Sequence, residues 1–206
     1  MLQLPSLFPE TFFASSVKGY KAEQLPTGRG KKKFQLPDTS LILGEDKFAD
    51  VYFFWNEGGI GILCEVQIPF TDCLYPKFQE GDCLELFIDT RDLKEAGVIH
   101  RFCHHFLFLP IEVQGVRALE ITHFRGEDKH PLADPSLFLV ESNFEKKSYQ
   151  LSVYIPKEAL FGFDPTTIPK LGFSYRLRRG RSSPQHFPTS FIEQFPSLWS
   201  TIFLKD

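Results

Sequence analysis

The stretch GDCLELFIDTRD, residues 81–92, decides the fold of this chain. Side chains alternate between the two faces of an extended segment, so Leu84, Leu86 and Ile88 fall on one side. The other side carries a thiol, two carboxylates and a phenyl ring: Cys83, Glu85, Asp89 and Phe87. The stretch therefore predicts a strand with one apolar face and one polar, aromatic face.

The same alternation recurs along most of the chain. Residues 48–68 hold two alternating runs around the turn sequence NEGG, and this pattern predicts a β-hairpin. Further strands are expected at residues 14–20, 100–109, 117–124, 137–142, 148–155, 171–177 and 199–204. About ten strands, with almost no helical periodicity, predict an all-β, single-domain antiparallel β-sandwich of the jelly-roll type with few short helical turns.

The composition fits one ordinary domain. The chain has 206 residues, of which 42% are hydrophobic and 24% are charged. These proportions are typical of a globular protein that buries a sizeable core. Residues 1–40 are interrupted by prolines, so we expect an irregular N-terminal segment that packs on or extends a sandwich formed by residues 41–206.

Charge and hydropathy argue against several kinds of partner. A formal net charge of −3 gives no electrostatic reason to bind nucleic acid or an anionic membrane. No apolar run approaches the ~20 residues of a transmembrane helix. The N-terminus lacks a basic region and is broken by prolines, so we expect no signal peptide and a soluble, cytoplasmic protein.

The cysteines are Cys64, Cys73, Cys83 and Cys103, and none of them forms a C-x-x-C pair. A zinc ribbon is therefore not expected. Without an export signal, we expect reduced and mostly buried thiols. A disulfide between Cys83 and either Cys64 or Cys73 is the alternative.

Three segments together carry a family resemblance: residues 48–57 (FADVYFFWNE), 81–91 (GDCLELFIDTR) and 171–176 (LGFSYR). Their order and spacing resemble the family-nine carbohydrate-binding modules and related sandwich domains, which include the DOMON sugar- and haem-binding domains. In that group a hairpin with a tryptophan precedes a D-x-x-E-L-F-I-D strand, and a late G-F strand closes the sheet. The resemblance covers residues 41–206 and implies a sandwich that binds carbohydrate without catalysis.

The chain departs from that group at several positions. Residues 60–62 read IGI where the group usually has Leu-Tyr-Val. The characterised sugar binders of the group clamp a sugar between two tryptophans, and only Trp55 and Trp199 exist here. Trp55 shares a strand face with other apolar residues, so both tryptophans are stacking candidates only if they are exposed. The single methionine, Met1, argues against haem bound by methionine and histidine.

The alternation also predicts a polar and aromatic sheet face. If the strands share a sheet, that face carries Glu65, Gln67, Glu85, Phe87, Asp89, Tyr154, Ser174 and Arg176. Carboxylates, amides and aromatic rings are the groups that bind sugars. We place the ligand-binding residues at Glu85, Asp89, Arg91 and Arg176, with Trp55 and Trp199 conditional. The alternative is a solvated face with cross-strand charge pairs such as Glu85 with Arg176.

The strand end Asp89-Thr90-Arg91-Asp92 has two interpretations. Oxygens of Asp89 and Asp92 could bind calcium or another ligand. Alternatively, hydrogen bonds among Asp89, Arg91 and Asp92 fix the loop. The absence of D-x-D-x-D spacing favours the second interpretation over calcium, so we expect no cofactor.

Enzymatic chemistry has less support in the sequence. His100 and His104 share a strand face about 13 Å apart, too far to bind one metal unaided. Glu85 and Asp89 are separated by a similar distance, which is too large for a paired-carboxylate glycosidase. We therefore expect a non-catalytic carbohydrate-binding domain. The alternatives are a scaffold domain of the same fold that binds another protein, and a hydrolase that uses residues 100–105. The sequence leaves the oligomeric state open.

Overall fold

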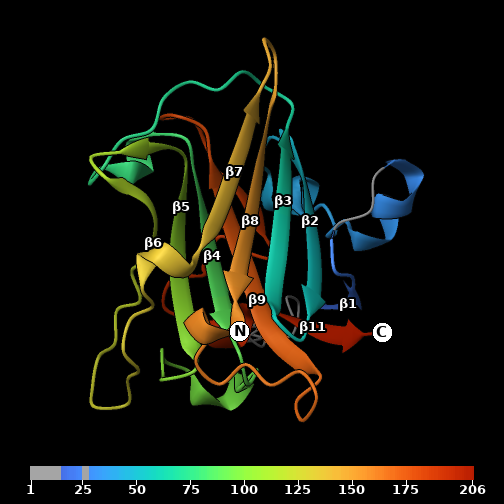
Figure 1. Cartoon of the computed structure of the whole chain (residues 1–206), viewed down its shortest axis with the longest axis vertical. Helices are drawn as coiled ribbons and strands as arrows, with labels where there is room; N and C mark the ends of the chain where they lie inside the picture. The colour runs from blue at the N-terminus through green and yellow to red at the C-terminus, as the bar shows by residue number, and fades with distance from the viewer. Residues whose placement is uncertain (1–14, 25–27) are drawn as a thin grey trace, which may run out of the picture.

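The chain folds into one all-β domain in the computed structural model, which describes residues 15–24 and 28–206 (Figure 1). The strands are β1 (Ser16–Lys21), β2 (Ala49–Asn56), β3 (Gly59–Val66), β4 (Cys83–Asp89), β5 (Cys103–Val113), β6 (Val116–Glu120), β7 (Leu139–Phe144), β8 (Tyr149–Pro156), β9 (Lys170–Arg178), β10 (Gln185–Phe187) and β11 (Ser200–Lys205). They form one hydrogen-bonded sheet in the order β6-β5-β4-β9-β11-β1-β2-β3-β8-β7, and β10 pairs with β9. The expected all-β class is confirmed.

Helical structure in the described residues is limited to short segments of three to seven residues. The α-helix α1 spans Ser40–Leu43. The 3-10 turns are η2 (Gly28–Phe34), η3 (Phe78–Glu80), η4 (Lys94–Ala96), η5 (Pro135–Leu137), η6 (Lys157–Ala159) and η7 (Pro196–Leu198). Among residues 15–24 and 28–206, no helix is long and apolar enough to span a bilayer.

The sheet folds over into two walls that face each other. The first wall consists of β6, β5, β4, β9 and β10, the second wall of β2, β3, β8 and β7, and the pair β11–β1 joins them. Phe53 of β2 meets Phe173 of β9 edge to face, with ring centroids 5.3 Å apart. On the opposite side, the Ser142 hydroxyl of β7 donates to the Pro110 carbonyl of β5 at 2.6 Å. The two ends of the sheet therefore approach each other, and the sandwich is nearly a barrel.

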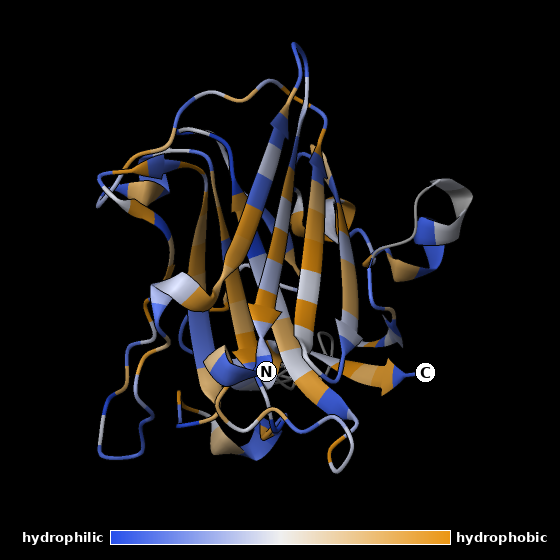
Figure 2. Cartoon of the chain, in the orientation of Figure 1, coloured by the Kyte–Doolittle hydropathy of each residue, from blue (hydrophilic) through white to orange (hydrophobic). Residues whose placement is uncertain are grey.

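The core fills the space between the walls. Leu84, Leu86 and Ile88 of β4 are fully buried in it, as the alternation predicts. Figure 2 shows the same alternation of hydrophobic and hydrophilic residues along β8. Both faces of β5 are covered, because Phe106 and Leu107, which point to opposite sides, are each fully buried.

Truncation of this core has a predictable cost. Leu86→Ala is expected to lower the free energy of unfolding by about 2–5 kcal/mol, because it removes buried methyl groups and leaves a cavity. Leu139→Ala is the matched control, since that side chain is 63% exposed, and its effect should stay within about 0.5 kcal/mol. Urea titrations measure both. Equal effects of the two substitutions would contradict this placement of the core.

The predicted hairpin is confirmed. β2 and β3 pair antiparallel, with Asn56 opposite Gly59. Gly59 has a φ of +155°, and a Cβ at this position would lie 2.2 Å from the Ile155 carbonyl oxygen of β8. Glycine is therefore required here, because it allows both the backbone conformation and the close approach of the neighbouring strand.

The N-terminal segment supplies a strand close to the one expected at residues 14–20, but its parallel pairing was not indicated by the sequence. β1 pairs in parallel with both β11 and β2, so the sheet is not purely antiparallel. Residues 1–14 lie outside the described part of the chain, and this includes the start of the strand expected at residues 14–20 and Met1. Leu36, from the same N-terminal segment, packs in the core.

Other local differences have simple causes. β5 starts at Cys103 and not at residue 100, because the Cys103 N–H donates to the His100 carbonyl at 2.8 Å and closes a turn. β10 lies outside the strands that alternation predicts. Its Gln185 side chain accepts from the backbone N–H groups of Phe48 and Ala49, which fixes β10 against β2. The four cysteines are free and buried, as expected.

Candidate ligand site

A buried charge network lies on the outer face of the first wall. Glu85 of β4 stands directly opposite Arg176 of β9, and their closest charged atoms are 3.3 Å apart. Glu85 also contacts Arg178 Nε at 2.8 Å and His105 Nε2 at 3.0 Å. Burial alone would raise the pKa of Glu85, but His105 and the two arginines more than offset it and hold the pKa at about 2. The cross-strand pair expected from the sequence is confirmed, and a pKa of about 2 keeps Glu85 ionised near neutral pH.

A second layer of contacts ties the following loop to this network. Arg176 also bonds Glu193, which lies in the loop after β10. The Arg176 Nε donates to His186 Nε2 at 3.0 Å, and His186 Nδ1 contacts Glu45 at 2.7 Å. Because His186 accepts on Nε2, its proton lies on Nδ1 and is donated to Glu45. The network therefore fixes residues 185–193 over the outer face of the first wall.

Next to this network lies a cleft of about 200 Å³. We call it the β4–β5 cleft; its lining includes Phe87, His105, Thr122, Arg125, Glu193, Gln194 and Trp199. The His105 ring stacks on Phe87, with centroids 4.1 Å apart and planes inclined by 24°. Its side chain is 20% exposed, so the cleft presents a fixed aromatic ring to solvent.

Three exposed polar side chains, Arg125, Glu193 and Gln194, form the rim of the cleft. Arg125 donates to the amide oxygen of Gln194 at 2.9 Å. Both residues are exposed, as is Glu193. The rim therefore offers a guanidinium, an amide and a carboxylate near the His105 ring, and these groups can donate and accept hydrogen bonds.

The two tryptophans are enclosed. Trp199 is 1% exposed, and its indole N–H donates to the Ile192 carbonyl at 2.8 Å. Trp55 is 5% exposed and donates to the Gly19 carbonyl at 2.9 Å. Neither indole has an open face for a sugar, so the condition set for a stacking role is not met. Trp199 packs beside Phe87 in the wall of the cleft, with ring centroids 5.9 Å apart.

Asp89 and Arg91 brace the loop after β4 and do not line the β4–β5 cleft. Asp89 accepts from the backbone N–H groups of Arg91 and Leu93 at 2.9 and 2.6 Å. The Arg91 guanidinium lies over the Phe102 ring, 5.3 Å from its centroid. The Asp92 oxygens contact the ammonium groups of Lys94 and Lys170 at 2.8 and 3.3 Å. The oxygens of these two carboxylates are therefore occupied by N–H donors and ammonium groups. A calcium site would instead surround the ion with oxygen ligands.

The expected polar face is in fact two faces. Glu85, Phe87, Ser174 and Arg176 lie together on the first wall, but Glu65 and Tyr154 lie on the second wall, because β3 and β8 pair with each other and not with β4. The outer side of the second wall carries a groove of about 830 Å³, which we call the β3–β8 groove. Its lining includes Phe54, Leu63, Glu65, Leu139, Glu141, Gln150 and Tyr154.

The cluster of Asp89, His100 and Cys103 resembles a catalytic relay only superficially. Cys103 Sγ lies 3.3 Å and Asp89 Oδ2 lies 3.5 Å from the same ring nitrogen of His100, Nε2. The other nitrogen, Nδ1, accepts from the Phe102 backbone N–H at 3.3 Å. In a working relay the nucleophile and the carboxylate contact opposite ring nitrogens. Burial also raises the pKa of the Cys103 thiol, which keeps it protonated and unreactive.

A second cluster with ligand-type side chains joins His104, Glu120 and His130, all buried. The strand pattern points to His104, but it does not single out Glu120 or His130. The sequence shows that these residues are of types that bind metals, but not that they lie together. Glu120 ends a strand and His130 lies in a loop, and only the tertiary fold brings both of them next to β5.

Comparison with known proteins gives matches in structure but not in sequence. No protein-family model and no curated protein matches the chain. A family 9 carbohydrate-binding module from Caldicellulosiruptor kristjanssonii in complex with glucose is similar, with a TM-score of 0.65 and 14% identity over 93% of this chain and 96% of that one. A module of the same family from this organism, in complex with cellotriose, is also similar. Its TM-score is 0.61, and the identity is 14% over 93% of this chain and 94% of that one. The chain therefore has the fold of the family 9 carbohydrate-binding modules.

Proposed function

We propose that this chain binds carbohydrate in the β4–β5 cleft and performs no catalysis on it. The observation that carries the proposal is the combination of a fixed ring and a polar rim within a volume comparable to one hexose unit. An aromatic ring packs on the C–H groups of a sugar, while guanidinium, amide and carboxylate groups exchange hydrogen bonds with its hydroxyls. The fold, shared with modules solved with glucose and cellotriose, supports the same proposal.

Rigidity also supports binding in this cleft. Glu85 fixes the orientation of His105 through Nε2, and Arg176 fixes Glu193. A site whose groups are already in place loses less conformational entropy when the ligand binds. The charged state of Glu85 argues against a role as a general acid, because a carboxyl with a pKa of about 2 does not donate a proton near neutral pH.

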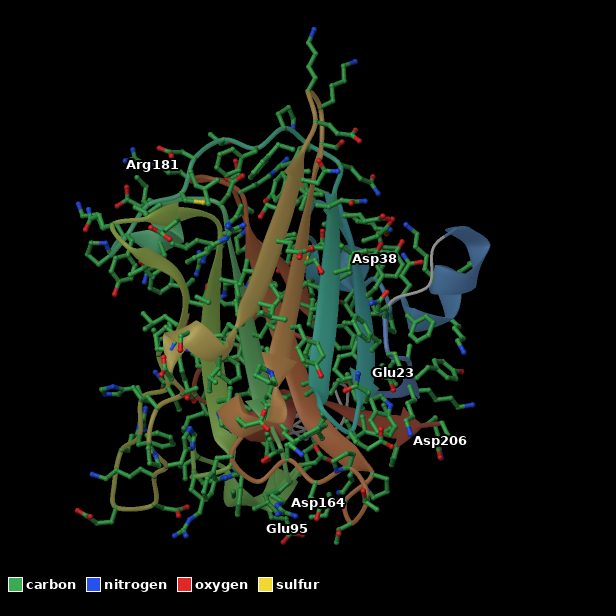
Figure 3. All side chains as sticks on the ribbon, in the orientation of Figure 1. Glu23, Asp38, Glu95, Asp164, Arg181 and Asp206 are labelled. Atoms are coloured by element: carbon green, nitrogen blue, oxygen red, sulfur yellow. The ribbon has the colours of Figure 1, made fainter. Side chains whose placement is uncertain are left out.

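The test is a glycan screen followed by calorimetric titration of the full chain with glucose and cellotriose. Wild type should bind at least one sugar saturably, and Arg125→Ala should weaken that binding roughly 10–100-fold, because it removes a charged hydrogen-bond donor. Arg181→Ala is the matched control; Arg181 is exposed and lies near the top of the view in Figure 3. No saturable binding by wild type to any sugar would contradict the proposal.

The β3–β8 groove favours a second candidate, an interaction domain that takes a longer ligand. Its volume is about 830 Å³, and Leu139 at its side is 63% exposed. Tyr154→Ala distinguishes the candidates, since it should abolish binding in the groove and leave binding in the β4–β5 cleft intact.

A further inference from the structure

Three buried side chains from separate segments converge at one end of the core. His104 belongs to β5, Glu120 ends β6, and His130 lies in the following loop. Glu120 Oε1 is 2.9 Å from His104 Nδ1 and 2.9 Å from His130 Nε2. The side chains of His104 and Glu120 are fully buried, and that of His130 is 1% exposed. This set, which we call the His–Glu–His cluster, takes no part in the β4–β5 cleft chemistry proposed above.

The hydrogen-bond partners of His130 require a positive charge at the cluster. Its Nδ1 lies 2.6 Å from the Arg101 carbonyl oxygen, and its Nε2 lies 2.9 Å from the Glu120 carboxylate. Both partners are acceptors, but a neutral imidazole carries a single N–H. If Nδ1–H donates to Arg101, a lone pair on Nε2 faces a carboxylate. Either a second proton or a metal ion must therefore lie between them.

His104 repeats the same arrangement. Its Nδ1 faces Glu120, and its Nε2 lies 3.4 Å from the Phe161 carbonyl oxygen. In each histidine the nitrogen remote from Glu120 points at a backbone carbonyl. Metal-binding histidines typically donate their other ring N–H in this way, which fixes both the tautomer and the ring orientation.

The carboxylate of Glu120 is held equally firmly. Its Oε2 accepts from the Ala133 backbone N–H at 2.7 Å, and its Oε1 accepts from the Thr122 hydroxyl at 2.7 Å. Outer contacts of this kind orient ligating carboxylates. The nitrogen and oxygen atoms that face the centre of the cluster are thus presented by side chains whose other atoms are already occupied.

We propose that His104 Nδ1, Glu120 Oε1 and His130 Nε2 bind a divalent transition-metal ion, with zinc as the representative case. Two imidazoles and one carboxylate suit zinc, and a water molecule enclosed with the ion would supply the fourth ligand. Tetrahedral zinc with bonds of about 2.0–2.1 Å places its ligand atoms roughly 3.3–3.4 Å apart. Glu120 Oε1, which lies 2.9 Å from each histidine nitrogen, would therefore move away from both nitrogens by a few tenths of an ångström.

The surroundings indicate a structural ion. Phe106 stacks on His104, with ring centroids 5.2 Å apart, and Phe161 stacks on His130 at 5.5 Å. These rings enclose the cluster, so the ion would enter as the chain folds. Once bound, it would fasten the loop that carries His130 to β5 and β6.

The neighbouring Asp89–His100–Cys103 cluster provides a contrast. There the Phe102 N–H donates to His100 Nδ1, so the ring proton lies on Nε2 and points at Cys103 and Asp89. A metal on Nε2 would move that proton to Nδ1, where it would face another N–H. The tautomer thus argues against a metal in this cluster, and Cys103→Ser serves as a control.

The test is to refold the full chain from urea with zinc and, in parallel, with EDTA. After gel filtration, elemental analysis should find one zinc per chain only in the first sample. The melting temperature of that sample should be higher, by roughly 5–10 °C at a hundredfold excess of free zinc over Kd. His130→Gln and Glu120→Gln should lose the zinc, and Cys103→Ser should retain it.

Two results would overturn the proposal. Wild type refolded with zinc that holds no ion and melts at the same temperature as the EDTA sample would show that a proton occupies the cluster. Zinc that persists in His130→Gln, or that disappears in Cys103→Ser, would place the ligands elsewhere. If the His130 and Glu120 variants do not fold, the absorption spectrum of cobalt-loaded wild type decides, because thiolate ligands would add an intense charge-transfer band.

Discussion

Glu85→Gln is expected to lower the free energy of unfolding by about 3–5 kcal/mol, the usual cost of removing one partner from a buried ion pair. Glu85 is 1% exposed and contacts Arg176, Arg178 and His105. Glutamine preserves the shape of the side chain but removes the carboxylate that Arg176 and Arg178 share, although Arg176 keeps its contact with Glu193. Urea or thermal unfolding of the purified variant measures the effect.

Two controls separate the charge from the shape. Glu57→Gln removes a carboxylate that pairs with Lys21 at the surface, and it should leave stability nearly unchanged. Adding Arg176→Met to Glu85→Gln should recover part of the loss, because it removes one of the two buried guanidinium groups that Glu85 balanced. A Glu85→Gln variant as stable as wild type would show that the network contributes little.

Acid should destabilise the protein through the same carboxylate. The pKa of Glu85 is about 2 in the folded protein, against an ordinary value of 4.5. The folded state therefore binds fewer protons than the unfolded state between these values. The stabilisation is fully present above pH 4.5 and is lost as the pH falls towards about 2. The difference corresponds to roughly 3 kcal/mol.

The comparison of wild type with Glu85→Gln isolates this contribution. Glutamine resembles a protonated glutamate, so the stability difference between the two proteins should be largest near pH 7 and should shrink as the pH falls below 4.5. Urea titrations at a series of pH values measure the difference. A difference that stays constant from pH 7 to pH 3 would contradict the low pKa of Glu85.

The strands could be predicted from the sequence wherever one strand face is apolar. Leu84, Leu86 and Ile88 alternate cleanly, and β4 forms where they indicate. The turn around Gly59 depends on local backbone conformation, so it is also visible in the sequence. The Glu85–Arg176 pair could be predicted because charges on adjacent strands pair across the register.

The composition of the site could not be predicted in the same way. Alternation shows which residues share a strand face, but it does not show which strands are neighbours. For this reason the pattern places Glu65 and Tyr154 on one face with Glu85, although they lie on the other wall. Burial of Trp199 depends on the loop before β11, which has no periodic pattern. Arg125 and His130 lie in a loop as well, and only the tertiary fold brings them to the cleft and the His–Glu–His cluster.

The most direct test of carbohydrate binding is amide chemical-shift mapping of the full chain during titration with glucose and with cellotriose. The proposal predicts saturable shifts centred on His105, Glu193 and Gln194 at the β4–β5 cleft. It would be contradicted by unchanged spectra with every sugar, or by shifts confined to Leu139, Gln150 and Tyr154 in the β3–β8 groove.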